Sequence, residues 1–282
     1  MSETREREKG VPSNVGSMIQ TERAAAFHAL HGDLLVLPNC WDAASAAVIE
    51  HAGAKALATS SAAVAWSLGT RDGNMLDRGL MLEHLQRICA VATVPVSCDV
   101  ESGFGDSAAD LAETTRLVIE AGAVGVNLED ALSGALRPVE EAADRVRVVR
   151  EAADAAGVNL YLNARTDSYL LGAADFEGTV ARAVAYLGAG ASGIFVPGVT
   201  DLEEVARLTA AIDAPVNILT GPGAPAVPAL KEAGARRVSA GSSLAGAIFG
   251  HIERATRELL EHGTYDELAG PRSWGEMNGL FA

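Results

Sequence analysis

From about residue 34 onward, the chain alternates short apolar runs with longer, alanine-rich amphipathic segments. Each apolar run is rich in β-branched residues and ends in polar ones, and the segment after it has the periodicity of a helix. This pattern predicts strands that are each followed by a helix. The runs are LLVLPN (34–39), ALATSS (56–61), PVSCDVE (95–101), AVGVNLED (123–130), NLYLNARTD (159–167), SGIFVPG (192–198), PVNILTGPG (215–223) and ARRVSAG (235–241).

The connections between these runs share a glycine-containing exit, read in HAGAKAL, EAGAVGV, GAGASGI and EAGARRV. Glycine there supplies the left-handed residue that ends a helix. Strict alternation favours a parallel sheet of the α/β class, and eight repeats close a (β/α)8 TIM-type barrel. A doubly wound open sheet is the alternative, but no G-x-G-x-x-G follows the first run. An extra helix, TERAAAFHALHGD (21–33), precedes the first strand, and a helical extension follows the last.

The domain organisation is simple. Residues 1–17 are polar and contain Gly, Ser and Pro, so we expect a mobile N-terminal tail. No linker divides the rest, and residues 18–282 are predicted to form a single barrel domain. The charged start of the chain is followed by no apolar signal-peptide core, and no apolar run is long enough to span a bilayer.

Composition narrows the class of partner. Lys and Arg total 22 against 37 Asp and Glu, a formal net charge of −15. Such an acidic surface argues against nucleic acid and against an anionic membrane, since both need basic patches. The three cysteines cannot all pair and lack metal-finger spacing, so we expect free thiols in a reducing compartment and a cytoplasmic protein.

The candidate chemistry lies at the carboxyl ends of the strands, where barrels of this class place their active sites. Asp99 and Glu101 are two residues apart and share a face of one strand, and Glu129 ends the next. Three carboxylates so close together would resist ionising, and a hard divalent cation, Mg²⁺ or Mn²⁺, relieves this. The alternative is that one or more of them caps a helix or pairs with Arg165.

Other mechanisms lack their residues. The three lysines lie away from the strand ends, which excludes a Schiff-base mechanism, and the histidines all fall in helical segments. Arg165 stands at the end of the fifth strand and suits bidentate capture of a substrate carboxylate. Its alternative role is that of a structural counter-ion for Glu129 or Asp167.

At these residues the sequence resembles the phosphoenolpyruvate mutase/isocitrate lyase superfamily. Four motifs carry the match in order. TSSAAVAWSLGTRDG resembles the second-strand segment that ends in an aspartate, here Asp72. CDVESGFGD resembles the D-x-D-x-G-[YF]-G signature, with Asp99 and Glu101 in its acidic positions. GVNLED places Glu129, and NARTD places Arg165.

The resemblance implies a Mg²⁺-dependent enzyme that acts on a small 2-oxo acid or its enol. It implies that Asp99, Glu101 and Glu129 hold the metal and that Asp72 supports its waters. Arg165 and Asp72 are the catalytic candidates. The predicted substrate-binding residues are Ser60, Ser61, Ala62, Arg165, Trp41 and Asn163. Members of the family usually form tetramers in which the eighth helix swaps between barrels, a role that HIERATRELLEHGTYDELAG (251–270) could serve. We therefore expect a homo-oligomer, a dimer of dimers.

The sequence also departs from the family. Isocitrate-type lyases carry a K-[KR]-C-G-H loop after the fourth strand, whereas EDALSGALRPVEEA here has no Lys, Cys or His. Loss of a carboxylate from a 2-oxo acid needs little beyond a cation and an arginine. We therefore predict a lyase or decarboxylase of an oxaloacetate-like acid that proceeds through a metal-stabilised enolate. Phosphorus–carbon chemistry on phosphonopyruvate and a non-catalytic 2-oxo acid binding barrel are the alternatives.

Overall fold

The computed structural model describes residues 13–281, and the side chains from residue 20 onward. Nine parallel strand segments form one sheet in the order β1-β11-β10-β9-β8-β5-β4-β3-β2. They are β1 (Leu35–Leu37), β2 (Asn39–Cys40), β3 (Leu57–Thr59), β4 (Val96–Asp99), β5 (Gly125–Glu129), β8 (Tyr161–Arg165), β9 (Gly193–Val196), β10 (Val216–Leu219) and β11 (Arg237–Ser239). All eight predicted runs contain strands, and the α/β barrel is confirmed.

The barrel closes at Pro38. Leu35–Leu37 pairs with β11, whereas Asn39–Cys40 pairs with β3, so the first strand changes partner on either side of the proline. Proline has no N–H to give to a sheet ladder, which makes it a natural point for this change. The nine segments therefore act as eight strands, with β1 and β2 as the two halves of the first.

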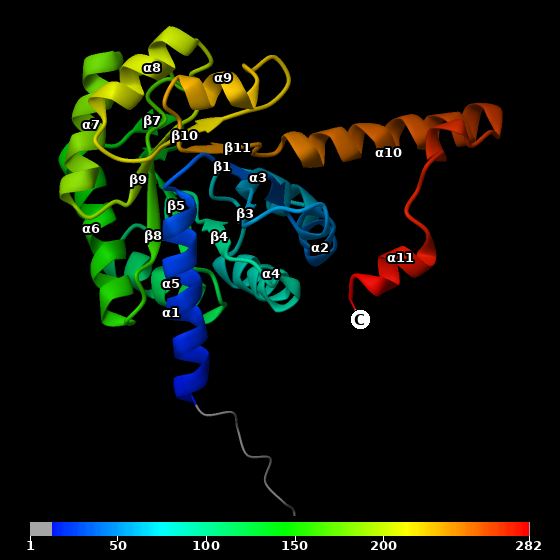
Figure 1. Ribbon diagram of the computed structural model, residues 1–282, viewed down its shortest axis with the longest axis horizontal. Helices are drawn as coiled ribbons and strands as arrows, with labels where there is room; N and C mark the ends of the chain where they lie inside the picture. The colour runs from blue at the N-terminus through cyan, green and yellow to red at the C-terminus, as the bar shows by residue number, and fades with distance from the viewer. Residues whose placement is uncertain (1–12, 282) are drawn as a thin grey trace, which may run out of the picture.

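Helices follow the strands and cover the outside of the sheet (Figure 1). They are α1 (Ser13–Leu30), α2 (Ala43–His51), α3 (Ser61–Ser67), α4 (Arg78–Val91), α5 (Ala108–Glu120), α6 (Val139–Ala155), α7 (Phe176–Gly188), α8 (Leu202–Ala211), α9 (Val227–Glu232), α10 (Ser243–His262) and α11 (Trp274–Gly279). The predicted glycine exits are confirmed, because Gly53, Gly122, Gly190 and Gly234 have φ of 101°, 106°, 104° and 92°. A hairpin that was not predicted, β6 (Ala131–Leu132) and β7 (Ala135–Leu136), follows β5.

The two ends of the chain extend beyond the barrel. The helix expected at 21–33 runs from Ser13 to Leu30, so residues 13–17 of the predicted 1–17 tail are helical; residues 1–12 of that tail lie outside the described residues. Figure 1 shows α10 running away from the sheet; the chain then turns back, and α11 lies below α10 in this view. Within residues 13–281, no helix combines the length and the hydropathy that a transmembrane segment needs.

The barrel interior is unusually polar. Apolar side chains such as Val126 and Leu162 are buried outside the sheet, beneath the helices. The strand residues that point to the other side, into the barrel, include the fully buried Asn163, Asn217 and Arg237. Barrels of this class are usually filled by branched apolar side chains. Here hydrogen bonds replace part of that packing.

Candidate active site

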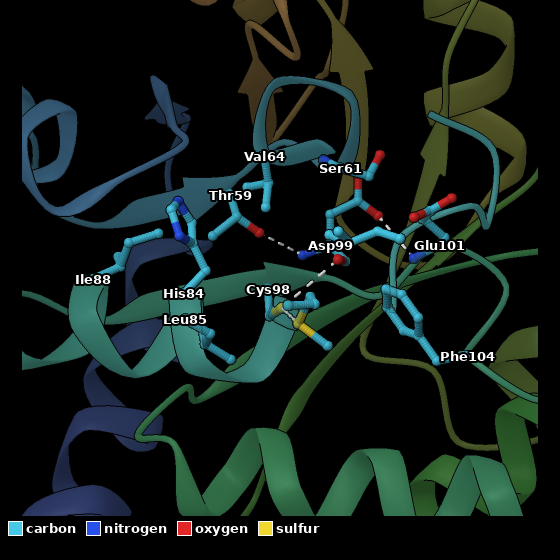
Figure 2. Close-up of a pocket in the computed structure, with 12 residues that line it drawn as sticks. Thr59, Ser61, Val64, His84, Leu85, Ile88, Cys98, Asp99, Glu101 and Phe104 are labelled. Carbon is cyan, nitrogen blue, oxygen red and sulfur yellow. Dashed lines mark hydrogen bonds between the residues drawn. The ribbon is translucent and has the colours of Figure 1, made fainter. Parts of the chain in front are cut away.

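Asp99 is held at the end of β4 by its neighbour strand. Its backbone N–H donates to Thr59 Oγ1 at 2.9 Å, which fixes the level of β4 against β3. One carboxylate oxygen accepts from the Ser61 N–H at 3.4 Å, at the first turn of α3. Figure 2 shows Thr59 and Asp99 at the ends of these adjoining strands, with Ser61 of α3 beside Asp99. The helix-capping alternative for Asp99 is thus part of its role.

Glu101 lies in a strained turn directly after β4. Its φ of 48° is in the left-handed region, which a non-glycine residue rarely adopts. The turn is held by Asn74, whose backbone N–H donates to the Glu101 carboxylate and whose Oδ1 accepts from Ser102 Oγ at 2.6 Å. The side chain is buried and points toward Asp99 and Asp72, both of which influence its charge. Strain of this kind persists where the surroundings enforce it, commonly at functional sites.

Arg165 sits between two carboxylates at the end of β8. Its Nε and Nη2 donate to Asp167 at 2.6 and 3.0 Å, and its Nη1 lies 3.1 Å from Glu129 Oε2. The register of the sheet places Glu129 and Arg165 side by side on β5 and β8. The counter-ion role that the sequence left open is therefore present, and it involves both partners.

A second layer of contacts fixes this pair from below. The Asp167 N–H donates to Asp130 Oδ1 at 3.0 Å. The other Asp130 oxygen accepts from Tyr186 at 2.7 Å and from Arg182 at 3.0 Å. The side chains of Asp167, Tyr186 and Arg182 are all buried or nearly so. A buried network whose hydrogen bonds are satisfied holds one geometry.

Two adjoining cavities open at this end of the barrel. The floor cavity, about 150 Å³, has walls of Asn39, Ser60, Ser61, Ala62, Asp72, Asp99, Asn127, Arg165, Leu170, Phe195, Pro197, Leu219, Ser239, Gly241 and Ser242. The acidic cavity, about 200 Å³, has walls of Ser61, Asp72, Gly73, Asn74, Glu101, Glu129, Ala131, Leu132, Ser133, Gly134, Arg165, Asp167 and Leu171. Ser61, Asp72 and Arg165 belong to both, so one small ligand can reach both groups of residues.

The charges at the mouth are shifted toward neutrality. Burial raises the pKa of Glu129 to about 8 and that of Glu101 to about 7, with nearby carboxylates adding to both shifts. Burial also raises the pKa of Asp99, although Arg165 opposes this. For Arg165, burial lowers the pKa, but Glu129, Asp167 and Asp99 outweigh it and the net pKa is raised. The arginine stays charged, while the carboxylates lack enough positive charge to ionise freely.

The chemistry of these side chains fits Mg²⁺. Carboxylate oxygens are the ligands that this ion prefers, and a cation would favour the ionised forms that burial now opposes. As placed in residues 13–281, however, no three His, Cys, Asp or Glu side chains are arranged as a metal site. Glu129 is paired with Arg165 instead. Asp99, Glu101 and Glu129 thus fit the ion by donor type rather than by a preassembled geometry.

The structure separates the predicted substrate residues into two groups. Ser60, Ser61 and Ala62 line the floor cavity with Arg165. Two residues lie apart from the walls of both cavities. Asn163 is buried beneath the floor, where its Nδ2 donates to Asn127 Oδ1 at 2.9 Å. Trp41 lies beside Phe249 of α10, with ring centroids 6.3 Å apart.

Several wall residues received no role from the sequence. Asn127 alternates with Glu129 on β5, so the same period-two pattern that found the glutamate points to it. Asn39 closes the barrel by donating to the Thr59 carbonyl at 2.9 Å and accepting from the Gly241 N–H at 2.8 Å. That contact joins positions 202 residues apart and has no local sequence signal.

A family model for phosphoenolpyruvate phosphomutase matches residues 27–260, most of the chain and all of the barrel strands. The chain belongs to this family. Among sequence relatives, an uncharacterised Mycobacterium tuberculosis H37Rv protein is 37% identical over 77% of this chain and 82% of its own. The 2-methylisocitrate lyase of Aeropyrum pernix is 30% identical over 84% of this chain and 79% of its own.

Solved structures of the family share the fold. A candidate lyase or mutase from Burkholderia cenocepacia J2315 superposes with a TM-score of 0.88 at 39% identity, covering 93% of this chain and 97% of its own. The family thus includes lyases and mutases, and it builds its enzymes on the barrel described above. The expected family membership and fold class are both confirmed.

Proposed function

We propose that this protein is a Mg²⁺-dependent lyase that cleaves a carbon–carbon bond of a small, oxaloacetate-like 2-oxo acid. The observation that supports this most is the mouth of the barrel. Asp99, Glu101 and Glu129 lie there with pKa values raised by burial, beside one charged Arg165. The carboxylate oxygens are suitable ligands for a metal ion, and Arg165 is a suitable partner for a substrate carboxylate. Both kinds of group line the same two small cavities.

Each side chain has a role that follows from its contacts. Asp99, Glu101 and Glu129 would hold Mg²⁺, and Asp72 would orient its waters. Mn²⁺ has the same ligand preferences and is the second choice. When bound, Mg²⁺ supplies a Lewis acid for the 2-oxo oxygen and for the charge that develops as the bond breaks.

The substrate carboxylate is assigned to Arg165. An arginine has five N–H donors in a planar fork, and the bonds to Asp167 and Glu129 leave the others for the cavities that it lines. Asp167 holds the fork in one orientation, so little ordering is needed when the carboxylate arrives. Ser60 and Ser61 lie across the floor cavity and offer hydroxyl groups to the same ligand.

Proton delivery falls to a water or to a serine hydroxyl. The Tyr169 hydroxyl donates to Glu204 and lies apart from the walls of both cavities. The hairpin β6–β7 that borders the acidic cavity contains no Lys, Cys or His. A reaction that needs no strong protein acid at this loop, such as decarboxylation, is therefore favoured. The lyase activity named for the Aeropyrum pernix relative supports the same class of reaction.

The test is Mg²⁺-dependent formation of pyruvate from oxaloacetate, measured against an EDTA control and against Mg²⁺ without protein. We expect enzyme-dependent turnover that Asp99→Ala lowers by at least about 10²-fold while the melting temperature is retained. Asp144→Asn, an exposed surface change on α6, is the matched control. Full turnover by Asp99→Ala would contradict the metal assignment.

Phosphonopyruvate is included as a second substrate, because the family model is that of a phosphomutase. Release of phosphate, or a new phosphorus resonance in NMR, would replace carbon–carbon cleavage by phosphorus–carbon chemistry. If the protein binds oxaloacetate and phosphonopyruvate but converts neither, the result would favour a barrel that binds 2-oxo acids without catalysis.

We also propose that the protein acts as a homo-oligomer, a dimer of dimers, in which α10 packs on a neighbouring copy. Leu244, Ile248 and Ile252 recur every four residues on this helix and are 37%, 47% and 53% exposed. Val36 on the outer side of β1 is 45% exposed, so one barrel strand lacks full cover. Light scattering should show an assembly that Ile252→Glu dissociates, and a monomeric unmodified protein would contradict this.

A further inference from the structure

We propose that Asn127 is a substrate-binding residue, whose side-chain amide donates a hydrogen bond to an oxygen of the bound acid from the floor of the cavity. The inference rests on the proposed function for the identity of the ligand, a small anionic 2-oxo acid. Neither the family motifs nor the relatives' names assign this residue a role. The orientation of its amide group decides which atom of Asn127 faces the cavity.

Arg237 fixes that orientation. Its guanidinium is 1% exposed and carries donors only, and its Nη2 lies 3.1 Å from Asn127 Oδ1. If the Asn127 amide were flipped, its own N–H groups would face those of Arg237, an arrangement without a hydrogen bond. The oxygen of Asn127 therefore points down into the barrel.

Asn163 completes the arrangement. Its Nδ2 donates to the same Asn127 oxygen at 2.9 Å, so both acceptor directions of that oxygen are used. Asn163 is fully buried and turns its nitrogen toward Asn127, so its own Oδ1 is left without a partner. A chain of positioning residues, Arg237 and Asn163, thus holds one rotamer of Asn127.

The Asn127 nitrogen is left to the cavity. Within residues 13–281 this nitrogen has no acceptor. Unlike the Asn163 oxygen, which is unpartnered and fully buried, it remains accessible. Asn127 lines the floor cavity, and the register sets it beside Asp99 on β4. Arg165 lines the same cavity. Two donors on one wall, a cation and an amide, select a ligand with two oxygen acceptors over one that presents a methyl group.

Asn127→Asp tests this directly. The substitution keeps the shape and the acceptor for Arg237 and Asn163, and it changes the cavity-facing atom from a donor to an acceptor. Oxalate is the probe, because it is a small dianion without a bond to cleave, and its binding in Mn²⁺ is measured by calorimetry. We expect its affinity to fall by at least about tenfold.

The control is Asn217→Asp, which introduces the same charge on β10 beside Arg237 but lies apart from the cavity walls. We expect it to change oxalate affinity by less than about twofold. The affinity for Mn²⁺ alone is measured for each variant. An extra carboxylate strengthens metal binding if it changes it at all, so weaker oxalate binding at equal or tighter Mn²⁺ binding arises at the contact of residue 127 with oxalate and not from loss of the metal.

Three results would overturn the inference. They are oxalate binding by Asn127→Asp within about twofold of the unmodified protein, an equal loss in Asn217→Asp, or no oxalate binding by the unmodified protein. The proposed function is judged separately, by turnover. A protein that converts no 2-oxo acid, yet loses oxalate in Asn127→Asp alone, would refute the lyase and retain Asn127 as a ligand-binding residue.

Discussion

Arg165 at the mouth of the barrel and Arg237 inside it are both buried, but their surroundings are opposite. Arg165 contacts Asp167 and Glu129, and these carboxylates raise its pKa. Arg237 donates to a neutral amide, has no carboxylate partner within residues 13–281, and burial lowers its pKa to about 10. The mouth is an acidic site in which one arginine is shared by several carboxylates, so a ligand can replace one of its partners. In the interior, Arg237 stabilises the structure through the hydrogen bond that it donates and not through an ion pair.

The end of the barrel below Arg237 is closed by α1. Phe27 and His31 pack on Tyr161, whose ring stacks on that of His31 at 3.8 Å between centroids. Burial, followed by Arg237, lowers the pKa of His31 to about 3, so it adds no charge. The aromatic side chains packed at this end differ from the carboxylates at the mouth. Substitutions of Arg165 and of Arg237 should therefore have different effects on stability and on activity.

The largest effect is expected for Arg165→Met. The change leaves Glu129 and Asp167 without their cation, which costs about 3 kcal/mol of unfolding free energy, and it removes the proposed partner of the substrate carboxylate. Turnover should fall by about 10³-fold. Denaturant unfolding and initial rates check both parts. Arg147→Met on the exposed side of α6 is the control, and equal stability of the two variants would contradict the role of the ion pairs of Arg165.

The next effect is a dependence of stability on pH. The folded-state pKa of Glu101 is about 7 and that of Glu129 about 8, both above their ordinary value. The folded protein therefore binds more protons than the unfolded chain, and its stability is greatest at acidic pH and falls as pH rises through 7 and 8.

In EDTA we expect a loss of order 1–3 kcal/mol between pH 5 and pH 8.5 from these two groups. Glu129→Gln should flatten the curve, and added Mg²⁺ should stabilise more at pH 8 than at pH 6. Melting temperatures across this range provide the measurement. A curve that is the same in Glu129→Gln and the unmodified protein would be incompatible with the raised pKa.

Arg237→Met should give a smaller effect of a different kind. Replacing a buried, unpaired cation by an apolar side chain of similar length is often neutral or stabilising, so unfolding free energy should stay within about 1 kcal/mol. Because Asn127 loses the donor that orients it, KM should rise about fivefold with little change in kcat. Destabilisation as large as that of Arg165→Met would erase the contrast between the two ends.

The smallest effect is expected for Trp41→Phe. Trp41 was predicted to bind substrate, but its ring packs near Phe249 and lies outside the cavity walls. KM should therefore change by less than about twofold. A tenfold rise in steady-state assays would place this side chain in the site of the assembled protein.

These contrasts also show what a sequence can reveal. The eight strands were predictable because an apolar run followed by an amphipathic helix is a local pattern. Asp99, Glu101, Glu129 and Arg165 were predictable because the ends of such strands meet at one edge. The pairing of Arg165 with both Asp167 and Glu129 was open, since either carboxylate satisfies the pattern and only the three-dimensional register decides.

Other features depend on contacts between distant residues. The reach of Asn163 into the interior, rather than the cavity, follows from its level on β8, which no local motif encodes. The hairpin β6–β7 forms from a segment with weak strand propensity, and Arg182 holds it by donating to the Arg137 carbonyl at 3.0 Å. Such contacts come from packing, which acts on the whole chain at once.

The change of strand partner at Pro38 has a consequence for how the protein is made. Asn39 borders the floor cavity and accepts a hydrogen bond from the N–H of Gly241, which comes 202 residues later in the chain and borders the same cavity. During synthesis the ribosome must therefore release most of the polypeptide before the pocket can exist. A nascent barrel has no ligand to stabilise it at this stage, so oxalate or Mg²⁺ should act only on the last step of folding.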